Sequence, residues 1–148
     1  MKYETCRYIY VKCRIIMSLL IQQPIKNSFE LLDLARRGVP KMAVLQMAKQ
    51  LRLTGKELTL IINLSERTLQ RYDDNKNLEK DASERAIQLA ALYERGYEVW
   101  GNEERFHAWM RHPNAAMDAK KPIELLDTLL GFQLVFDEIG RIEHGILA

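Results

Sequence analysis

Cysteine is scarce in this sequence of 148 residues, and histidine is hardly more common. The two cysteines, Cys6 and Cys13, both lie near the beginning of the chain, so no framework of cysteine pairs supports the fold. This usage is typical of a protein in a reducing cytoplasm. His107 and His112 are five residues apart, whereas metal ligands on one helical face stand about four residues apart. The sequence therefore predicts a cytoplasmic protein without a metal site.

Long apolar runs and catalytic motifs are also missing. No apolar run approaches the roughly 18 residues that a membrane span requires. The apolar segment 15–21 is short and has no small-residue cleavage site after it, so we do not expect a secretory signal. There is no glycine-rich phosphate loop, and no serine, cysteine or second carboxylate is placed to join Glu143 and His144 in a catalytic group. We therefore predict a protein that is not an enzyme and binds no cofactor.

An excess of one charge is absent overall, yet the charges are unevenly spread. The net charge of +2 is too small to indicate nucleic-acid binding by itself. Residues 1–40 and 41–76 carry net charges of +4 and +3, whereas residues 77–104 and 105–148 carry −4 and −1. The composition, 47% hydrophobic and 28% charged, is ordinary for a globular protein of one domain or two small ones.

Residues 1–27 differ from the rest of the chain. Residues 8–16 are rich in aromatic and β-branched side chains, the composition of a strand, but no comparable strand follows to pair with them. Three interpretations stay open: a flexible basic arm, a short strand or helix packed on a partner, or a true start at Met17. We favour a poorly ordered N-terminal arm.

Helical signals dominate after residue 27, so we predict an all-α protein. Ser28 can cap a helix over 29–37 that stops at Gly38. Its expected buried residues are Phe29, Leu32, Leu34 and Ala35. Pro40 then opens a helix over 41–53, in which the apolar residues recur at helical spacing and predict a core-facing stripe of Val44, Leu45, Ala48 and Leu51.

Residues 54–72 have the layout of a helix-turn-helix. Thr54 caps a short helix that Asn63 breaks, and Leu64 reaches the core at the turn. Ser65 caps the next helix, in which Leu69 is the inward anchor. The expected inward residues of the first helix are Leu58, Ile61 and Ile62.

Two further helices are expected before residue 113. Asp81 and Glu84 have capping-box spacing and predict a helix to about Arg95, with Gly96 after it. Asn102 caps another helix, which Pro113 ends. The predicted buried residues of these two helices are Ala86, Leu89, Ala90 and Tyr93, followed by Phe106, Trp109 and Met110.

The last forty residues predict two short helices. Pro122 suits a first helical turn, and Gly131 is placed as the left-handed residue that ends the same helix. Gly145 ends the second helix. The expected apolar sets are Ile123, Leu126, Leu129 and Leu130 for the first helix, and Phe132, Val135, Phe136, Ile139 and Ile142 for the second.

Two stretches resemble one known family. Residues 65–71 are similar to the helix-turn-helix of Xre-type antitoxins. Trp109 with residues 113–114, residues 122–128 with Gly131, and residues 141–145 resemble the toxin-binding domain of the Xre/MbcA/ParS antitoxins, the partners of RES-domain toxins. Two departures are visible: residues 115–121 stand where the family usually has a small residue or glycine pair, and Gly140 lies inside the last helix.

The helix-turn-helix implies a set of DNA contacts. Its second helix enters the major groove with its N-terminal residues on base edges, and an arginine such as Arg67 can read guanine. Ser65 and Thr68 suit phosphates or bases, and Lys56 suits a backbone phosphate. Ordinary solvated polar residues on a capped helix are the alternative. The candidate DNA-binding residues are Lys56, Ser65, Glu66, Arg67, Thr68, Gln70 and Arg71.

The resemblance also implies how the chain meets its toxin. In that family the last helix and terminus insert into the cleft of the RES toxin, which degrades NAD⁺. The polar groups here could pair with a charged pocket, because carboxylates match a cationic, NAD-binding site. Surface residues of a terminal helix are the alternative. The candidate toxin-binding residues are Arg141, Glu143, His144, Gly145 and Ala148.

These observations lead to one prediction of architecture and function. We expect an N-terminal arm over 1–27, an Xre-like helix-turn-helix domain over 28–96 and a small helical toxin-binding domain over 97–148. The resemblance implies a type II antitoxin that neutralises a RES-domain toxin, represses its own operon and forms at least a dimer. The alternative is a stand-alone helix-turn-helix regulator whose C-terminal domain serves dimerisation.

Overall fold

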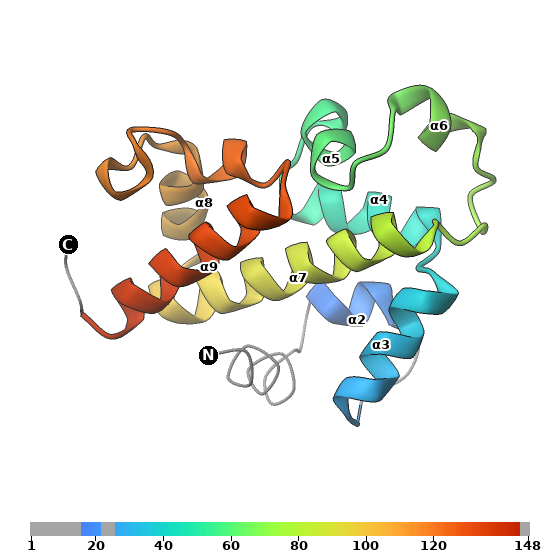
Figure 1. Ribbon diagram of the computed structural model, residues 1–148, viewed down its shortest axis with the longest axis horizontal. Helices are drawn as coiled ribbons and strands as arrows, with labels where there is room; N and C mark the ends of the chain where they lie inside the picture. The colour runs from blue at the N-terminus through green and yellow to red at the C-terminus, as the bar shows by residue number, and fades with distance from the viewer. Residues whose placement is uncertain (1–15, 22–25, 146–148) are drawn as a thin grey trace. The chain divides into compact units, whose positions relative to one another are not determined.

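The computed structural model describes residues 16–21 and 26–145, and helices account for nearly all of their regular structure (Figure 1). These residues form eight α-helices and two short 3₁₀ helices, with no strand among them. The prediction of an all-α protein is confirmed. The chain forms two compact units with their boundary between Tyr93 and Glu94, and each unit is described by itself below.

The first unit begins with a helix that the sequence did not predict. Helix α2 (Ile16–Leu20) buries Ile16, Met17 and Leu20 and packs against α4 (Lys41–Gln50). The expectation of a poorly ordered arm is therefore wrong for these residues, because their apolar side chains join the core instead. Both cysteines and the strand-like residues 8–15 lie outside the described part of the chain.

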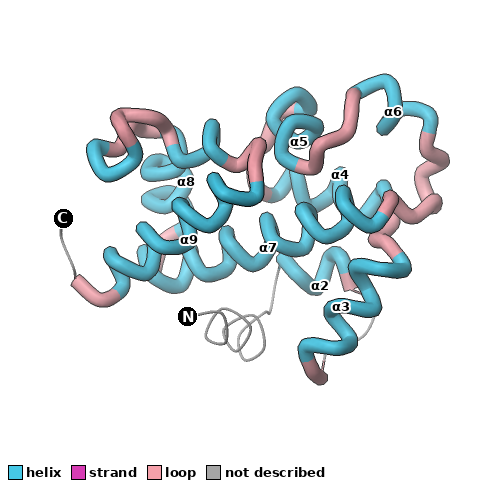
Figure 2. The backbone as a smooth tube through the Cα atoms, viewed as in Figure 1, coloured by secondary structure: helices cyan, strands magenta, loops and turns pink. Residues whose placement is uncertain are grey.

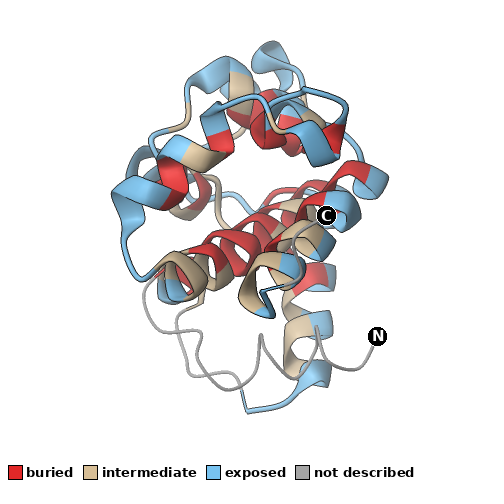
Figure 3. Cartoon of the chain, turned by 90° about the vertical axis from the view of Figure 1, so that its left-hand side faces the viewer, coloured by how far each residue is buried: buried red, intermediate tan, exposed pale blue. Residues whose placement is uncertain are grey.

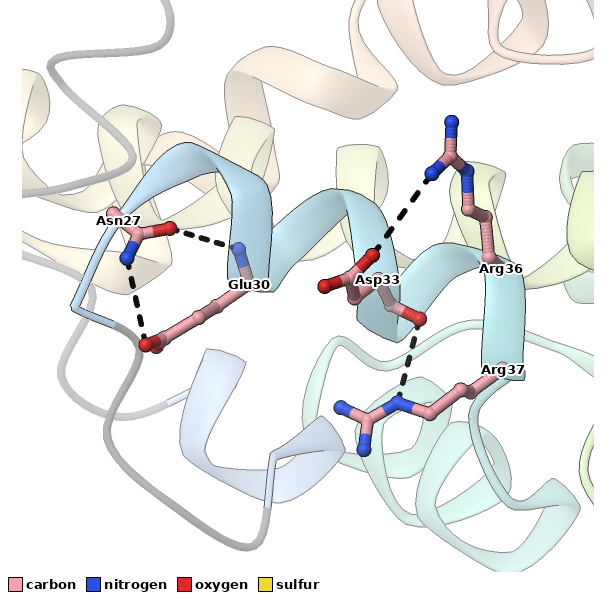
Figure 4. A network of polar contacts seen from close by, with 5 residues as sticks. All are labelled: Asn27, Glu30, Asp33, Arg36 and Arg37. Atoms are coloured by element: carbon pink, nitrogen blue, oxygen red, sulfur yellow. Dashed lines mark hydrogen bonds and ion pairs between the residues drawn. The ribbon is translucent and has the colours of Figure 1, made fainter.

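Helix α3 (Ser28–Arg37) begins one residue earlier than predicted, at the residue expected to cap it. Asn27, rather than Ser28, is the N-cap, and its side-chain oxygen accepts a hydrogen bond of 3.0 Å from the backbone N–H of Glu30. Figure 4 shows this cap together with the ion pair between Asp33 and Arg36, whose charged atoms are 3.9 Å apart. All of these polar contacts lie on the surface, so they define the helix end rather than the core.

The apolar side of α3 also differs from the prediction. Phe29 is 76% exposed and Leu32 is exposed as well, whereas Ala35 is buried. The predicted stripe is therefore wrong at Phe29 and Leu32, because the helix turns the face that carries Ala35 towards the unit. Gly38 ends α3 as predicted, with a positive φ of 86° and its N–H donating to the Leu34 carbonyl.

Helix α4 follows Pro40 as predicted, but it ends at Gln50, three residues early. Its inner face buries Val44, Met47 and Ala48, and Leu51, the residue after the helix, is buried too.

The buried Ser83 links two segments of backbone that lie before α4 and before α7. The Ser83 hydroxyl accepts a hydrogen bond from the Val39 N–H and donates to the Leu78 carbonyl, which leaves no buried polar group unsatisfied at this point.

Helix α7 (Lys80–Trp100) is longer than predicted at its C-terminal end. It starts at Lys80, so Asp81 lies in its first turn rather than at the cap, and it continues through Gly96 to Trp100. The loop before it, residues 72–79, separates it from α6 (Glu66–Arg71) and is drawn mainly as loop in Figure 2. The predicted buried residues of α7 are confirmed: Ala86, Leu89, Ala90 and Tyr93.

Gly96 lies inside α7, at a place where a neighbouring helix packs too closely to leave room for a side chain. A Cβ at Gly96 would overlap the ring of Phe106, which is fully buried on α8 (Glu103–Arg111). The prediction that α7 ends before Gly96 is therefore wrong, and the glycine marks a close contact between helices. Trp109 packs beside Phe106, with ring centroids 5.8 Å apart, and near Trp100 at 4.8 Å.

After α8 the chain forms two 3₁₀ helices, of which the second stands where an α-helix was predicted. Helix η1 (Ala115–Met117) follows Asn114, and η2 (Pro122–Leu125) begins at Pro122. Ile123 and Leu126 are buried as predicted. The helix that was expected to run from Pro122 to Gly131 is not formed. Helix η2 ends at Leu125, and Thr128 caps a new helix that contains Gly131.

Helix α9 (Leu129–Glu143) therefore starts before the glycine that was predicted to separate two helices. The Thr128 side chain accepts a hydrogen bond from the Gly131 N–H at 3.0 Å. A Cβ at Gly131 would overlap the Leu125 carbonyl, so the glycine allows α9 and η2 to touch. Phe132, Val135 and Ile139 are buried as expected, whereas Leu129 and Leu130 are exposed, against the prediction.

Most buried residues lie on the inner faces of helices in both units (Figure 3), and Val39, Leu51, Leu78 and Leu126 are buried between helices. In α9 the buried residues recur at helical spacing, and in α7 a long buried face carries several alanines that permit close approach. No helix within the described residues is long and apolar enough to cross a membrane.

Candidate functional site

The first candidate surface is the pair of helices predicted as a helix-turn-helix. Helix α5 (Gly55–Ile61) carries a complete capping box: the Thr54 hydroxyl accepts from the Glu57 N–H at 3.1 Å, and the Glu57 carboxylate accepts from the Thr54 N–H at 2.9 Å. This reciprocal pair fixes where α5 begins. The inward residues are confirmed as Leu58, Ile61 and Ile62.

The turn between α5 and α6 follows the predicted breakers. Asn63 has a positive φ of 56°, a conformation that asparagine tolerates better than most residues. The Leu64 N–H donates to the Thr59 carbonyl at 3.0 Å, and Leu64 is half-buried at the turn. Arg85 of α7 donates to the Ile61 carbonyl at 3.3 Å, which holds the end of α5. These contacts fix the conformation of the turn between α5 and α6.

Helix α6 presents a polar outer face and a single inward anchor. Ser65 is its cap, and its hydroxyl accepts from the Thr68 N–H at 3.0 Å and lies 2.7 Å from the Thr68 hydroxyl. Leu69 is buried, as predicted. All of the candidate DNA-binding residues are exposed: Lys56, Ser65, Glu66, Arg67, Thr68, Gln70 and Arg71. They lie together on α5 and α6, which contact each other.

Charges next to this surface are partly paired. The Lys41 ammonium donates to the Tyr72 carbonyl at 2.8 Å and lies 3.5 Å from the Asp74 carboxylate. Lys76 lies over the Tyr72 ring, with its ammonium 5.0 Å from the centroid. The Asp74 charge is thus partly offset beside α6. This pairing reduces the repulsion that an isolated carboxylate would exert on a phosphate.

The second candidate surface is the end of α9. Arg141 is exposed, and its guanidinium lies 3.4 Å from the Glu138 carboxylate one turn earlier. Glu143 is half-buried and accepts a hydrogen bond of 2.8 Å from the Arg95 guanidinium of α7, within the second unit. A Cβ at Gly140 would lie 3.2 Å from the same guanidinium, so the glycine leaves room for it. Gly140 therefore does not interrupt α9.

The remaining toxin-binding candidates follow at the end of the helix. His144 and Gly145 are exposed, and Gly145 has a positive φ of 68°. Ala148 lies outside the described residues. Glu143 differs from these neighbours because its carboxylate already has a protein partner. It can hold the last turn of α9 in place while Arg141 and His144 face solvent.

Sequence reasoning missed two features of this surface. Arg95 was read as the end of its helix, and no local signal pairs it with Glu143, which is 48 residues away. The outward position of Leu129 and Leu130 was missed as well, although Thr128 is a good N-cap and could have indicated a helix that starts at Leu129. The DNA-binding and toxin-binding roles of the candidate residues stay predictions.

Metal and aromatic features do not define a third site. Among residues 16–21 and 26–145, no three His, Cys, Asp or Glu side chains are grouped so that they could hold a metal ion. His107 is buried, and its Nε2 lies 2.9 Å from the Tyr97 hydroxyl. This pairing satisfies two polar groups inside the second unit and indicates a structural role for His107.

Comparison with known sequence families connects both surfaces to one class of protein. Residues 30–91 match the family described as an antitoxin Xre-like helix-turn-helix domain. Residues 95–145 match the antitoxin Xre/MbcA/ParS C-terminal toxin-binding domain. The chain belongs to the Xre/MbcA/ParS-type antitoxins. No curated protein sequence matches the chain.

The family gives each unit of the antitoxin a general role. The first match contains the whole of α5 and α6, and the second contains the Arg95–Glu143 ion pair and ends at Gly145. Together the two matches account for 113 of the 148 residues. The chain is thus an antitoxin with a helix-turn-helix part and a toxin-binding part.

Proposed function

We propose that this antitoxin neutralises a RES-domain toxin, an enzyme that degrades NAD⁺, by placing its C-terminal segment in the toxin's active-site cleft. One observation carries the proposal: the toxin-binding match extends to Gly145 and so includes the end of α9. The order of residues 141–145 resembles the segment that enters the toxin in this family. Residues 97–148 would form the toxin-binding domain, and residues 28–96 the DNA-binding domain.

The chemistry of the end of α9 suits such an insertion. Arg141 and His144 are exposed, and the carboxylate of Glu143 is fixed 2.8 Å from Arg95. A pocket that binds NAD⁺ must hold a diphosphate, so its wall is cationic, and Glu143 is the one acidic side chain within residues 141–145 that would match it. A segment that occupies this pocket would exclude the substrate. Glu143 would have two roles: its bond to Arg95 would keep the last turn of α9 ordered, and its carboxylate would contact the toxin.

The second part of the proposal is repression of the antitoxin's own operon. The exposed face of α6, with Arg67 and Arg71, would enter the major groove, and Lys56 would contact a phosphate. The basic first half of the chain supports this role, since residues 1–76 carry a net charge of +7. Paired half-sites require two copies of the reading helix, so we propose a dimer.

A growth-rescue experiment tests the toxin part of the proposal. The RES-domain toxin would be expressed with the full chain, with a chain that ends at Gly145, or with a chain that ends at Gly140. The full chain should restore growth and the chain ending at Gly140 should not. The chain ending at Gly145 keeps the Arg95–Glu143 pair. It therefore distinguishes the contribution of the last three residues to rescue from that of the end of α9.

The outcomes of this experiment are distinct. Rescue by all three chains would place toxin binding before residue 140. Rescue by none of them, with the proteins soluble, would contradict the proposal and favour a stand-alone helix-turn-helix regulator. For the DNA part, Arg67→Ala should weaken operator binding at least about tenfold, while the exposed Lys120→Ala should leave it unchanged.

A further inference from the structure

The exposed apolar surface of the second unit is concentrated on one helix. Among the described residues from Glu94 onwards, the large hydrophobic side chains that are exposed are Leu129 (54%), Leu130 (72%) and Leu134 (51%). All three lie in the first half of α9. Single exposed leucines are common on protein surfaces, but three within six residues form a patch of the kind that marks interfaces.

The packing of α9 explains why these leucines face outward. Phe132, Val135 and Ile139 occupy the buried face, and Leu130 and Leu134, four residues apart, share the opposite one. The start of the helix is fixed by the Thr128 cap and by the close contact of Gly131 with the Leu125 carbonyl. The patch is therefore held on a rigid element, which lowers the entropy lost when a partner binds.

The surroundings of the patch are acidic. Residues 122–140 contain four acidic residues and no lysine or arginine, and two of the four, Glu124 and Glu138, form ion pairs with Lys121 and Arg141 at the borders of this segment. Exposed Asp127 stands just before the leucines and exposed Asp137 just after them. The Asp137 carboxylate accepts a hydrogen bond of 2.8 Å from the Gln133 amide, which keeps it on the outer face of α9. A complementary partner would have an apolar groove with a basic rim.

We propose that the outward face of α9, formed by Leu129, Leu130 and Leu134 between Asp127 and Asp137, docks into an apolar, basic-rimmed groove on the toxin. This inference rests on the proposed function. Two observations favour the toxin as occupant: the patch lies within the toxin-binding match, and its acidic rim is complementary to an enzyme that binds an anionic dinucleotide. The groove borders the cleft that receives residues 141–145, so its rim shares the positive charge that binding of the dinucleotide requires.

The two contacts would divide the work of neutralisation. Glu143 stands nine positions after Leu134 in the same helix, which corresponds to a rise of about 13.5 Å. The leucine face would supply apolar burial and therefore a slow dissociation. The end of α9 would block the cleft. Loss of the leucines should weaken binding, whereas loss of the end should leave a complex that forms but does not inhibit.

The test measures binding of the full chain to purified RES-domain toxin by surface plasmon resonance. The double variant Leu130→Ala/Leu134→Ala keeps good helix formers on an exposed face, so its thermal unfolding should be unchanged. We expect its Kd to rise about 100-fold, mainly through faster dissociation. Leu60→Ala is the matched control, because Leu60 is an exposed leucine of the first unit (56%) and should bind as the wild type does.

A charge variant tests the acidic rim separately. Asp137→Lys should slow association with the toxin about fivefold at low salt, and the difference should shrink as salt is added. Glu84→Lys makes the same charge change on an exposed residue of α7 in the first unit and serves as its control. An equal effect of the two variants on the association rate would contradict the proposal that the toxin's groove has a basic rim.

Three outcomes overturn the proposal in distinguishable ways. Toxin binding by the double leucine variant within about threefold of wild type would remove the patch from the interface. A loss of self-association in light scattering, with toxin binding intact, would assign the patch to a second copy of the chain. Failure of the wild-type chain itself to bind the toxin would overturn the proposed function, and the docking surface with it.

Discussion

In the first unit Gly38 ends α3, whereas in the second unit Gly96, Gly131 and Gly140 all lie inside helices. The first unit follows the local rule that glycine terminates a helix. In the second unit these three glycines lie where a Cβ would meet the Phe106 ring, the Leu125 carbonyl or the Arg95 guanidinium, whereas Gly101 and Gly145 follow helix ends with positive φ. A glycine in a helical pattern can therefore mark either the end of a helix or a place where two elements touch.

The consequence is functional as well as structural. The three interior glycines allow close contacts within the second unit, between α7 and α8, between α9 and η2, and between α9 and α7, and α9 carries both proposed toxin contacts. In the first unit, local residues fix the positions of the helices instead. The N-caps Thr54 and Ser65 and the turn residue Asn63 define the helix-turn-helix. The two units should therefore respond differently to glycine and cap substitutions.

The largest effect is expected for Gly131→Ala. The new Cβ would overlap backbone, which cannot move aside as a side chain can, so the second unit should lose about 3 kcal/mol of unfolding free energy. Urea unfolding followed by tryptophan emission measures this, since both tryptophans, Trp100 and Trp109, lie in the second unit. Gly55→Ala is the control, because nothing lies within 4 Å of its Cβ. Equal midpoints for both variants would refute the contact.

Gly96→Ala should rank next. Its Cβ would meet the Phe106 ring, a side chain that can shift, so we expect a loss of about 2 kcal/mol in the same tryptophan assay. The effect of Gly96→Ala should be smaller in a Phe106→Leu background, where the ring is absent. An unchanged loss in that background would show that Phe106 is not the cause.

Cap removal should have a moderate effect confined to the first unit. Thr54→Ala removes the hydroxyl that accepts from the Glu57 N–H and should lower stability by about 1 kcal/mol. Circular dichroism at 222 nm would report the change in helix unfolding, and tryptophan emission should report little. A larger shift in tryptophan emission than in circular dichroism would contradict the assignment of this cap to the first unit alone.

The smallest effect is expected for Gly140→Ala. The nearest atom, 3.2 Å from the new Cβ, is the end of the flexible Arg95 side chain, which can yield. The higher helix propensity of alanine should then dominate and raise stability by about 0.5 kcal/mol. Thermal unfolding of the variant measures the sign. A loss of more than about 1 kcal/mol would show that the Arg95–Glu143 pair tolerates no displacement.

Local signals explain which parts of the fold could be predicted. Thr54, Asn63 and Ser65 each act on residues within four positions, so the boundaries of α5 and α6 followed from the sequence. Gly96 and Gly131 could not be interpreted in this way, because the Phe106 ring and the Leu125 carbonyl are brought to them by tertiary packing. The same reason explains the wrong burial of Leu129 and Leu130, which depends on where α9 begins.

The candidate sites show the same division. The exposure of α6 follows from its single inward leucine, and the sequence pattern was enough to predict it. The partner of Glu143 was not predictable, because Arg95 lies 48 residues earlier and belongs to another helix. The leucine patch on α9 likewise required the position of the helix start. What these surfaces bind is inferred from their chemistry and from the family.

The most direct test of the antitoxin mechanism is NAD⁺ turnover by purified RES-domain toxin as the full chain is titrated in. Insertion of the C-terminal segment into the cleft predicts that turnover falls to zero at a fixed ratio of the two proteins. The chain ending at Gly140 should leave turnover high. Undiminished NAD⁺ degradation in the presence of excess folded full-length chain would contradict the mechanism.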